Sequence, residues 1–347
     1  MRQLTCVGPR QIEWRDVPEP QLMGDDEALV RPLAVARCEI DPLLIATARA
    51  DAPPFALGHE CVAEVVSLGD DVRGLEIGQR VVPSFQLSCG HCQPCGVGNT
   101  ANCAAYPVLS DYGMQPLSGI EYGGMLSDLL RVPHAESMLQ PVPEGSDPVA
   151  LASASDNVLD GYRTVAPHLA THPAANVLIV CHGAPSIALY GAQTALALGA
   201  GRVDFASDRA DVLALAGKLG ANPIETDFAR RQDRYPIVVD CGQRVEGLHY
   251  ALASTVPEGI CQSVSFFAAS TTPVPLGKLY TLGIRLFIGR AHAAALLPQV
   301  MPLIAQGRLH PEEVTTRVVT WEDAPEAYLE DTIKLVVRRE AAPRPPH

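Results

Sequence analysis

Apolar and polar positions alternate in short runs through the first 150 residues, and clusters of Pro, Gly and Asp separate these runs. Runs of this length, bounded by turn-forming residues, are typical of β-strands. The clearest candidates are EALVRPLAVA (27–36), CVAEVVSLG (61–69), QRVVPS (79–84) and LSDLLRVP (126–133). Their irregular spacing predicts a compact, barrel-like β domain.

The pattern changes near Asn176, where continuous apolar runs begin to alternate with stretches of helical period. The predicted strands are NVLIV (176–180), RVDFAS (202–207), YPIVVDC (235–241), GICQSVSF (259–266) and IRLFIG (284–289). The predicted helices are IALYGAQTALALGA (187–200), DVLALAGKLGA (211–221) and VEGLHYALAS (245–254). This alternation predicts a parallel sheet with crossover helices on both faces. One or two helices and a closing strand follow, and the tail 341–347 is predicted to be disordered.

The negative net charge of the chain argues against two classes of binding partner. The 347 residues carry a formal net charge of −13, and no long basic run is present. Nucleic acids and anionic membranes both require a basic face, so neither is expected as a partner. Residues 173–201 lack charged side chains, but Asn176, His182 and Gln193 would be costly within a membrane span. The N-terminal residues lack a signal-peptide core, so a cytoplasmic protein is expected.

Four cysteines fall within eighteen positions in QLSCGHCQPCGVGNTANC (86–103). A disulfide framework is disfavoured in a cytoplasmic protein, and a redox CxxC motif would leave two thiols unexplained. Cysteines at these spacings supply the four thiolates of a closed, tetrahedral zinc site. The predicted ligands of this structural zinc are Cys89, Cys92, Cys95 and Cys103.

A second candidate site combines a thiol, an imidazole and a carboxylate. Cys38, His59 in the motif GHE (58–60) and Asp156 would bind zinc as three mixed ligands and leave a fourth position open. Two other interpretations stay open at this point. The histidine can be structural, and the cysteine can be a small buried hydrophobic residue.

GHE is followed by VxxLGxxVxGLxIGxRVV (65–82), the four-cysteine segment and the strand–helix alternation. This combination resembles the zinc-dependent medium-chain alcohol dehydrogenases over nearly the full length of the chain. The resemblance implies an α/β fold with two domains. A GroES-like β-barrel catalytic domain would comprise 1–158 and 291–347, and a Rossmann domain with a doubly wound parallel sheet would comprise 159–290.

The resemblance also implies the roles of individual residues. Cys38, His59 and Asp156 would bind the catalytic zinc, with Asp160 as the rival third ligand. Glu60 would lie beside the metal and could exchange with a ligand, and Asp41 would orient His59. The implied activity is hydride transfer between NAD or NADP and an alcohol or carbonyl substrate, with zinc polarising the substrate oxygen. Relatives of this kind imply a homodimer or homotetramer.

The glycine-rich turn that binds a dinucleotide is altered in this chain. Gly183 is present, with Ser186 and Ile187 as further candidate cofactor contacts. Cys181 and Ala188 stand where glycine is expected, and His182 could either reach a phosphate or block one. Two alternatives follow: a zinc enzyme with a non-redox, lyase- or hydrolase-type activity and impaired nucleotide binding, or a catalytically silent binding protein.

Two further cofactor contacts are open to interpretation. Ser207 with Arg209 favours NADP, whereas Asp208 between them favours NAD, and the balance is slightly toward NADP. Lys334 matches a basic position that contacts the pyrophosphate in relatives.

The substrate pocket is expected to be apolar. Ile40 stands where relatives place a hydroxyl that relays the alcohol proton, so the relay residue is open. The expected lining is Ile40, Leu43, Phe85, Tyr106 and residues near Phe266, which predicts a hydrophobic small-molecule substrate.

Overall fold

The computed structural model describes all residues except 116, 118–119, 121, 232, 268–270 and 341–347. The predicted disordered tail therefore lies outside the described residues. Contacts divide the chain into two compact units. Unit 1 comprises Met1–Asp156, His292–Ala305 and Thr315–His347, and unit 2 comprises Asn157–Ala291 and Gln306–Val314. The domain assignment of 1–158 with 291–347 stays a prediction.

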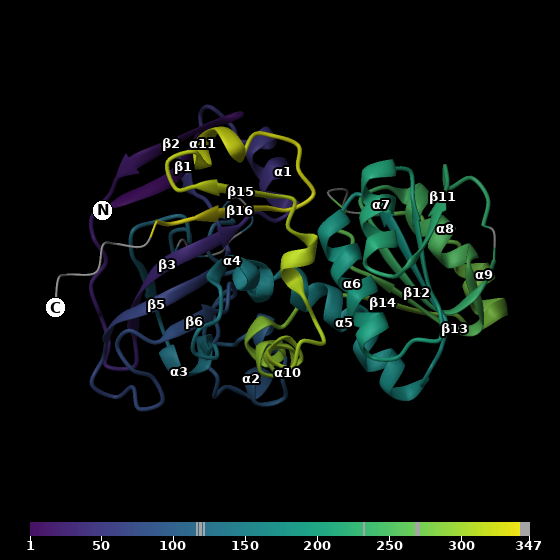
Figure 1. The fold of residues 1–347 in the computed structure, drawn as a ribbon, viewed down its shortest axis with the longest axis horizontal. Coiled ribbons are helices and arrows are strands. Elements are labelled where there is room, and N and C mark those ends of the chain that lie inside the picture. Colours follow the sequence, from purple (N-terminus) through teal and green to yellow (C-terminus); the bar gives the residue numbers. More distant parts are fainter. Residues whose placement is uncertain (116, 118–119, 121, 232, 268–270, 341–347) are drawn as a thin grey trace. The chain divides into compact units, whose positions relative to one another are not determined.

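Unit 1 contains two β-sheets, which form where the alternating pattern predicts strands (Figure 1). The smaller sheet has the order β2-β1-β4, with antiparallel pairs. Its strands are β1 (Arg2–Gly8), β2 (Gln11–Asp16) and β4 (Phe55–Ala56). The larger sheet has the order β15-β16-β3-β5-β6-β8, and β7 also pairs with β3. Its strands are β3 (Ala28–Ala36), β5 (Glu60–Leu68), β6 (Arg80–Pro83), β7 (Leu130–Val132), β8 (Leu139–Pro141), β15 (Arg317–Thr320) and β16 (Leu335–Arg338).

The larger sheet brings the two ends of the chain together in unit 1. β16 pairs antiparallel with β3, so the C-terminal strand lies beside one of the first strands of the chain. The α-helices of this unit are α1 (Ile40–Thr47), α2 (Gln93–Gly96), α3 (Ala135–Met138), α4 (Pro148–Leu151), α10 (Ala293–Ala305) and α11 (Ala324–Ala327). The short 3₁₀ helices are η1 (Thr100–Asn102) and η2 (Ala152–Ser155).

Unit 2 is built on a six-stranded sheet with the order β11-β10-β9-β12-β13-β14. All of its pairs are parallel, and the order reverses beside β9, which defines a doubly wound sheet. The strands are β9 (Val177–His182), β10 (Val203–Ser207), β11 (Asn222–Glu225), β12 (Tyr235–Gly242), β13 (Thr255–Ser263) and β14 (Arg285–Ile288). The alternation of apolar strands and helices predicted this parallel sheet, and the prediction is confirmed.

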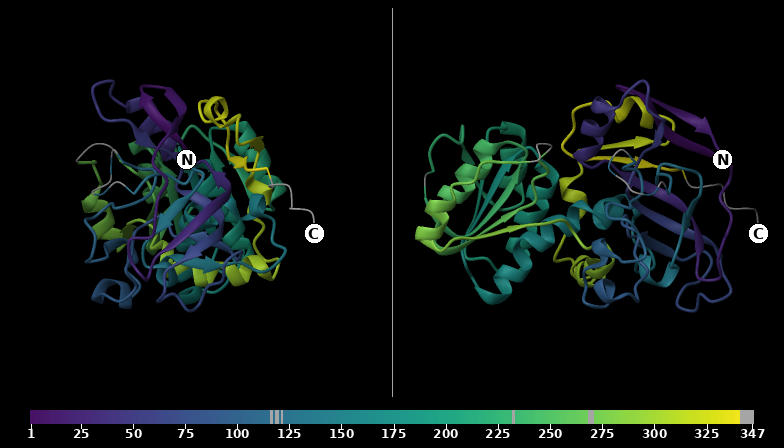
Figure 2. Two further views of the ribbon diagram at one scale, coloured as in Figure 1. Left: turned by 90° about the vertical axis from the view of Figure 1, so that its left-hand side faces the viewer. Right: turned by 180° about the vertical axis from the view of Figure 1, so that it is seen from behind.

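Helices cover both faces of the parallel sheet. They are α5 (Asn157–Thr171), α6 (Pro185–Ala197), α7 (Ala210–Lys218), α8 (Val245–Ala253), α9 (Leu276–Leu282) and the 3₁₀ helix η3 (Pro311–Val314). Figures 1 and 2 show α5 and α6 on one face of the sheet and α8 and α9 on the other. This coverage explains why every residue of β9 is buried.

The uncharged stretch 173–201 forms β9 and α6, as a strand, turn and helix. In the parts of the chain that the structure describes, no helix is apolar over the length required to cross a membrane.

Close packing of α5 on α6 gives a first prediction. A Cβ atom added at Gly161 would lie 2.7 Å from the backbone nitrogen of Gly191, so the two helices would have to separate. We expect Gly161→Ala to lower the free energy of unfolding by about 1–3 kcal/mol, as overpacked cores do. Gly277→Ala on α9 is the matched control, because nothing lies within 4 Å of its added Cβ. Equal denaturation midpoints for the two variants would contradict the prediction.

Candidate functional site

Cys38 and Asp41 are fixed at the junction between β3 and α1. The backbone N–H of Cys38 donates a hydrogen bond of 3.1 Å to Oδ2 of Asp41. The carboxylate of Asp41 is fully buried, and its Oδ1 lies 3.4 Å from Nδ1 of His59. This contact fits the predicted role of Asp41 in orienting the imidazole.

Asp156 reaches the same place from the end of η2, where the backbone is held by Ser155. The hydroxyl of Ser155 accepts the N–H of Cys61 at 3.2 Å and donates to the carbonyl of His59 at 3.4 Å. Oδ2 of Asp156 then lies 3.4 Å from Nε2 of His59. Ser155 therefore joins the segments that supply two of the predicted ligands, a role that its sequence context did not indicate.

The three predicted ligands meet in a buried group. Donor atoms of Cys38, His59, Glu60 and Asp156 all lie within 4.8 Å of one another. Neither ring nitrogen of His59 meets the geometry of a hydrogen bond with a described residue, although the ring is fully buried. In a tetrahedral zinc site, a nitrogen ligand and an oxygen ligand lie about 3.3–3.5 Å from each other. The distance of 3.4 Å between Nε2 of His59 and Oδ2 of Asp156 matches this separation. The donor set and the unsatisfied imidazole both fit a bound metal ion.

Asp160, the rival third ligand, has a different partner. It lies on α5 of unit 2, and its carboxylate forms an ion pair with the guanidinium of Arg163.

Buried negative charge dominates the electrostatics of this group. Burial lowers the pKa of His59, but the carboxylates of Asp41, Asp156 and Glu60 outweigh it and raise this pKa to about 9. Burial raises the pKa of the Cys38 thiol well above its usual value, and the carboxylates of Asp156 and Glu39 raise it further. A cation in this position would relieve both effects, because it favours the thiolate and the neutral imidazole.

Glu60 is held by Lys334, a contact that the sequence did not indicate, while the pyrophosphate contact expected for this lysine stays a prediction. Nζ of Lys334 is fully buried and donates to both carboxylate oxygens of Glu60, at 2.8 and 3.0 Å. It also donates to the carbonyl of Arg37 at 3.0 Å. An ammonium has three N–H donors, and these bonds hold it beside the candidate ligand group.

Arg37 is a second residue that sequence reasoning missed. Its guanidinium donates to the carbonyls of Tyr328, Glu330 and Thr332, at 2.9, 2.6 and 3.1 Å. These bonds fasten the segment before Lys334 to the end of β3. An arginine at the end of an apolar strand, next to a candidate ligand, is the signal that could have identified it.

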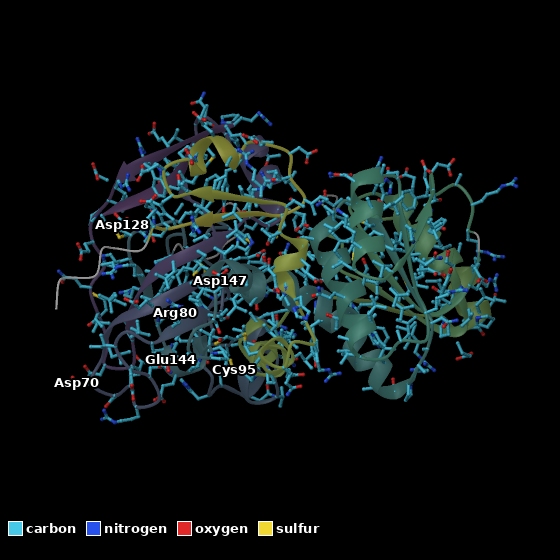
Figure 3. All side chains as sticks on the ribbon, in the orientation of Figure 1. Asp70, Arg80, Cys95, Asp128, Glu144 and Asp147 are labelled. Atoms are coloured by element: carbon cyan, nitrogen blue, oxygen red, sulfur yellow. The ribbon has the colours of Figure 1, made fainter. Side chains whose placement is uncertain are left out.

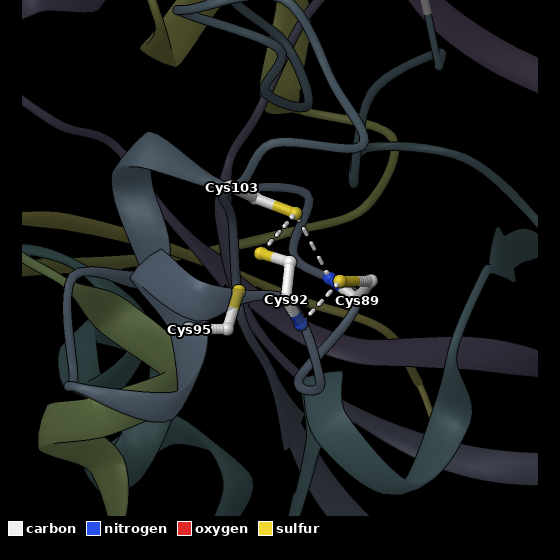
Figure 4. Close-up of side chains that lie close together, drawn as sticks. All are labelled: Cys89, Cys92, Cys95 and Cys103. Carbon is white, nitrogen blue, oxygen red and sulfur yellow. Dashed lines mark hydrogen bonds between the residues drawn. The ribbon is translucent and has the colours of Figure 1, made fainter.

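The four cysteines of segment 86–103 form a second group whose sulfur atoms lie within 4.8 Å of one another. Figure 4 shows the four side chains turned toward a common centre. The backbone N–H of Cys89 donates a hydrogen bond to Sγ of Cys103, and that of Cys92 donates to Sγ of Cys89. N–H donors from Ala104 and Cys95 lower the pKa of Cys92 to about 6. All ten cysteines are free thiols, so none is in a disulfide. The arrangement fits a closed tetrathiolate metal site.

Contacts around the cysteine group correct one expectation for the substrate pocket. Tyr106 packs against the cysteines and therefore belongs to this group. Cys95 lies on α2, in the part of unit 1 that also contains α10 (Figure 3). Phe85, by contrast, lies beside the first group, with its ring centroid 5.8 Å from that of His59.

The altered glycine-rich turn of unit 2 lies between the end of β9 and the start of α6. Cys181 and His182 are the last residues of β9, and α6 begins at Pro185. Gly183 makes the turn with a φ of +152°, and a Cβ there would lie 3.0 Å from the backbone nitrogen of Gln243. Gly183 therefore forms the turn as expected, and the replacement of a fingerprint glycine by Cys181 at the end of β9 stays a prediction.

His182 has partners within unit 2. Its ring stacks on Phe228, with centroids 4.3 Å apart and planes 15° apart. Ser186 and Ile187, the further candidate cofactor contacts, lie in the first turn of α6, and the hydroxyl of Ser186 accepts a hydrogen bond of 2.6 Å from Nδ2 of Asn157.

Comparisons with known proteins agree with this architecture. Residues 24–144 match the family described as the alcohol dehydrogenase GroES-like domain. A probable zinc-binding alcohol dehydrogenase of Mycobacterium tuberculosis is 27% identical over 94% of this chain and 84% of that protein. A medium chain reductase/dehydrogenase of an Acremonium species is 28% identical over 82% of this chain and 93% of that protein. The solved alcohol dehydrogenase of Thermus sp. ATN1 superposes with a TM-score of 0.87 and 25% identity, covering 98% and 100% of the two chains.

The buried pair of Lys334 and Glu60 gives a second prediction. Lys334→Met leaves the Glu60 carboxylate buried without a counter-charge, so we expect a loss of about 3–5 kcal/mol in the free energy of unfolding. The double variant Lys334→Met/Glu60→Gln should recover part of this loss. Lys278→Met, at an exposed position on α9, is the control. Denaturant titration measures these losses. Equal unfolding midpoints for Lys334→Met and Lys278→Met would refute the prediction.

Proposed function

Because this chain belongs to the zinc-type medium-chain dehydrogenase family, we propose that it is an NAD(P)-dependent alcohol dehydrogenase or carbonyl reductase. The observation that carries the proposal is the buried group of Cys38, His59 and Asp156, with an unsatisfied imidazole at its centre. A doubly wound sheet with Gly183 at the first turn supports the use of a dinucleotide.

We propose two zinc ions per chain, one held by Cys38, His59 and Asp156 and one by the four cysteines. Zinc held in the first site would supply Lewis-acid chemistry at the substrate oxygen, and a bound nicotinamide would supply the hydride chemistry. Asp41 fixes the ring of His59 so that Nε2 faces the ligand group. Lys334 holds both oxygens of Glu60, so Cys38, His59 and Asp156 would be the three protein ligands and a fourth position would be open for substrate.

The substrate is proposed to be an apolar alcohol or carbonyl compound. Phe85 lies beside His59, and Ile40 follows Cys38 by two residues, so apolar side chains border the ligand group. A cytoplasmic location is proposed as well, because ten free thiols suit a reducing compartment. The sequence leans slightly to NADP through Ser207 and Arg209, but the charges near them support the opposite preference, which is argued below.

No observation favours the non-redox alternative. The altered turn after β9 was the main reason to consider that alternative. Gly183 still forms this turn, and His182 stacks on Phe228.

Metal analysis coupled to an activity assay tests the function. We expect two zinc ions in the purified chain, and reduction of NAD or NADP with a panel of aliphatic and aromatic alcohols. Cys38→Ser should lose one zinc and slow turnover by about a thousandfold, because Lewis-acid stabilisation supplies several kcal/mol. Cys92→Ser should lose the other zinc and mainly lower the unfolding temperature. Two zinc ions without binding of either nucleotide would refute the redox function.

A homodimer formed through unit 2 is also proposed. β14 is the edge strand of the parallel sheet, so one of its edges is unpaired within the described chain. Ile288 on β14 and Tyr280 on α9 are 71% and 91% exposed. An exposed apolar edge of this kind pairs readily with a second copy.

The mass of the protein in solution tests the dimer. Ile288→Lys places a charge on the edge strand, so we expect light scattering to show the mass of one chain in place of two. Ile77→Lys is the matched control, because Ile77 is also 71% exposed but lies in unit 1. A dimer that survives Ile288→Lys, or that both variants abolish, would exclude this interface.

A further inference from the structure

The tips of β10 and β11 in unit 2 border a cavity of about 440 Å³. Ser207 and Glu225 are paired in register as the last residues of these parallel strands, so the residues after them meet at one edge of the sheet. The cavity is lined by Asp208, Glu225, Thr226, Asp227 and Arg230. In doubly wound folds, the tip of the second strand is where the adenosine ribose is bound.

The lining of this cavity is acidic. It contains three carboxylates and one guanidinium, that of Arg230. Asp208 is also fixed in place, because its Oδ2 lies 3.2 Å from Nη2 of Arg244 and 3.7 Å from Nε2 of His182. A held carboxylate is suited to accept hydrogen bonds from the hydroxyls of a ribose.

The two residues that suggested NADP are engaged elsewhere. Ser207 is fully buried, and its hydroxyl accepts the backbone N–H of Arg209 at 3.2 Å. The guanidinium of Arg209 donates to both carboxylate oxygens of Asp211, at 3.1 and 2.6 Å. A bidentate pair of this kind would have to break before Arg209 could bind a phosphate.

We propose that the enzyme selects NAD over NADP, and that Asp208 and Asp227 are the residues that determine this selectivity. The inference rests on the proposed function, since it assigns the cofactor of the same enzyme. The 2′-phosphate of NADP carries about −1.5 to −2 charges at neutral pH, like other phosphate monoesters. Three carboxylates around the cavity repel that phosphate, whereas the free hydroxyls of NAD can donate to them.

Calorimetric titration of the zinc-loaded full chain with NAD and with NADP tests the proposal without requiring a substrate. We expect NAD to bind at least about tenfold more tightly than NADP, a difference of about 1.4 kcal/mol. Asp208→Asn/Asp227→Asn removes two carboxylates and frees Arg244. The ratio of the two dissociation constants should then fall by at least about tenfold, mainly through tighter binding of NADP.

Asp233→Asn is the matched control, because Asp233 is an exposed carboxylate of unit 2 that pairs with Arg202 at 3.2 Å. It should leave the ratio unchanged, and circular dichroism confirms that each variant is folded. Equal or tighter binding of NADP to the wild type overturns the selectivity and leaves the dehydrogenase function standing. A ratio that moves equally in the control and the double variant overturns the role of the two aspartates. Failure of both nucleotides to bind overturns the dehydrogenase function together with the selectivity.

Discussion

Compensation of buried negative charge is the constraint on which the candidate catalytic site depends. Cys38, Asp41, Glu60 and Asp156 are all buried in unit 1 around the imidazole of His59. Uncompensated charges in such surroundings cost several kcal/mol each, so the group requires cations. Lys334 supplies one to Glu60, and the unsatisfied imidazole marks where a metal ion would supply the other. Metal binding and the stability of unit 1 are therefore expected to be linked.

This requirement explains why distant segments converge in unit 1. β16 pairs with β3, which brings Lys334 to Glu60 at the start of β5. Arg37 fastens the segment before Lys334 through three backbone carbonyls. The C-terminal strand thus completes the electrostatics of a site whose other members come from the first half of the chain.

Unit 2 accommodates a bulky residue at the end of the first strand of its parallel sheet. His182 is bulky for the end of a first strand, but it stacks on Phe228 and lies beside Asp208. The turn itself is made by Gly183, and the first turn of α6 follows directly. Acidic side chains gather at the tips of β10 and β11, where we propose that the cofactor ribose is bound.

The sequence by itself predicted the main strands of the larger sheet in unit 1, most of the parallel sheet of unit 2 with its crossover helices, and the two groups of candidate metal ligands. These follow from local periodicity, and from ligand types and spacings that zinc requires. Only the tertiary structure decided that Lys334 binds Glu60, that Ser155 joins His59 to Asp156, and that Gly183 opens the turn after His182. It also placed Tyr106 with the cysteines and Arg209 with Asp211. These contacts depend on which side chains meet across strands and loops, and no local pattern encodes that geometry.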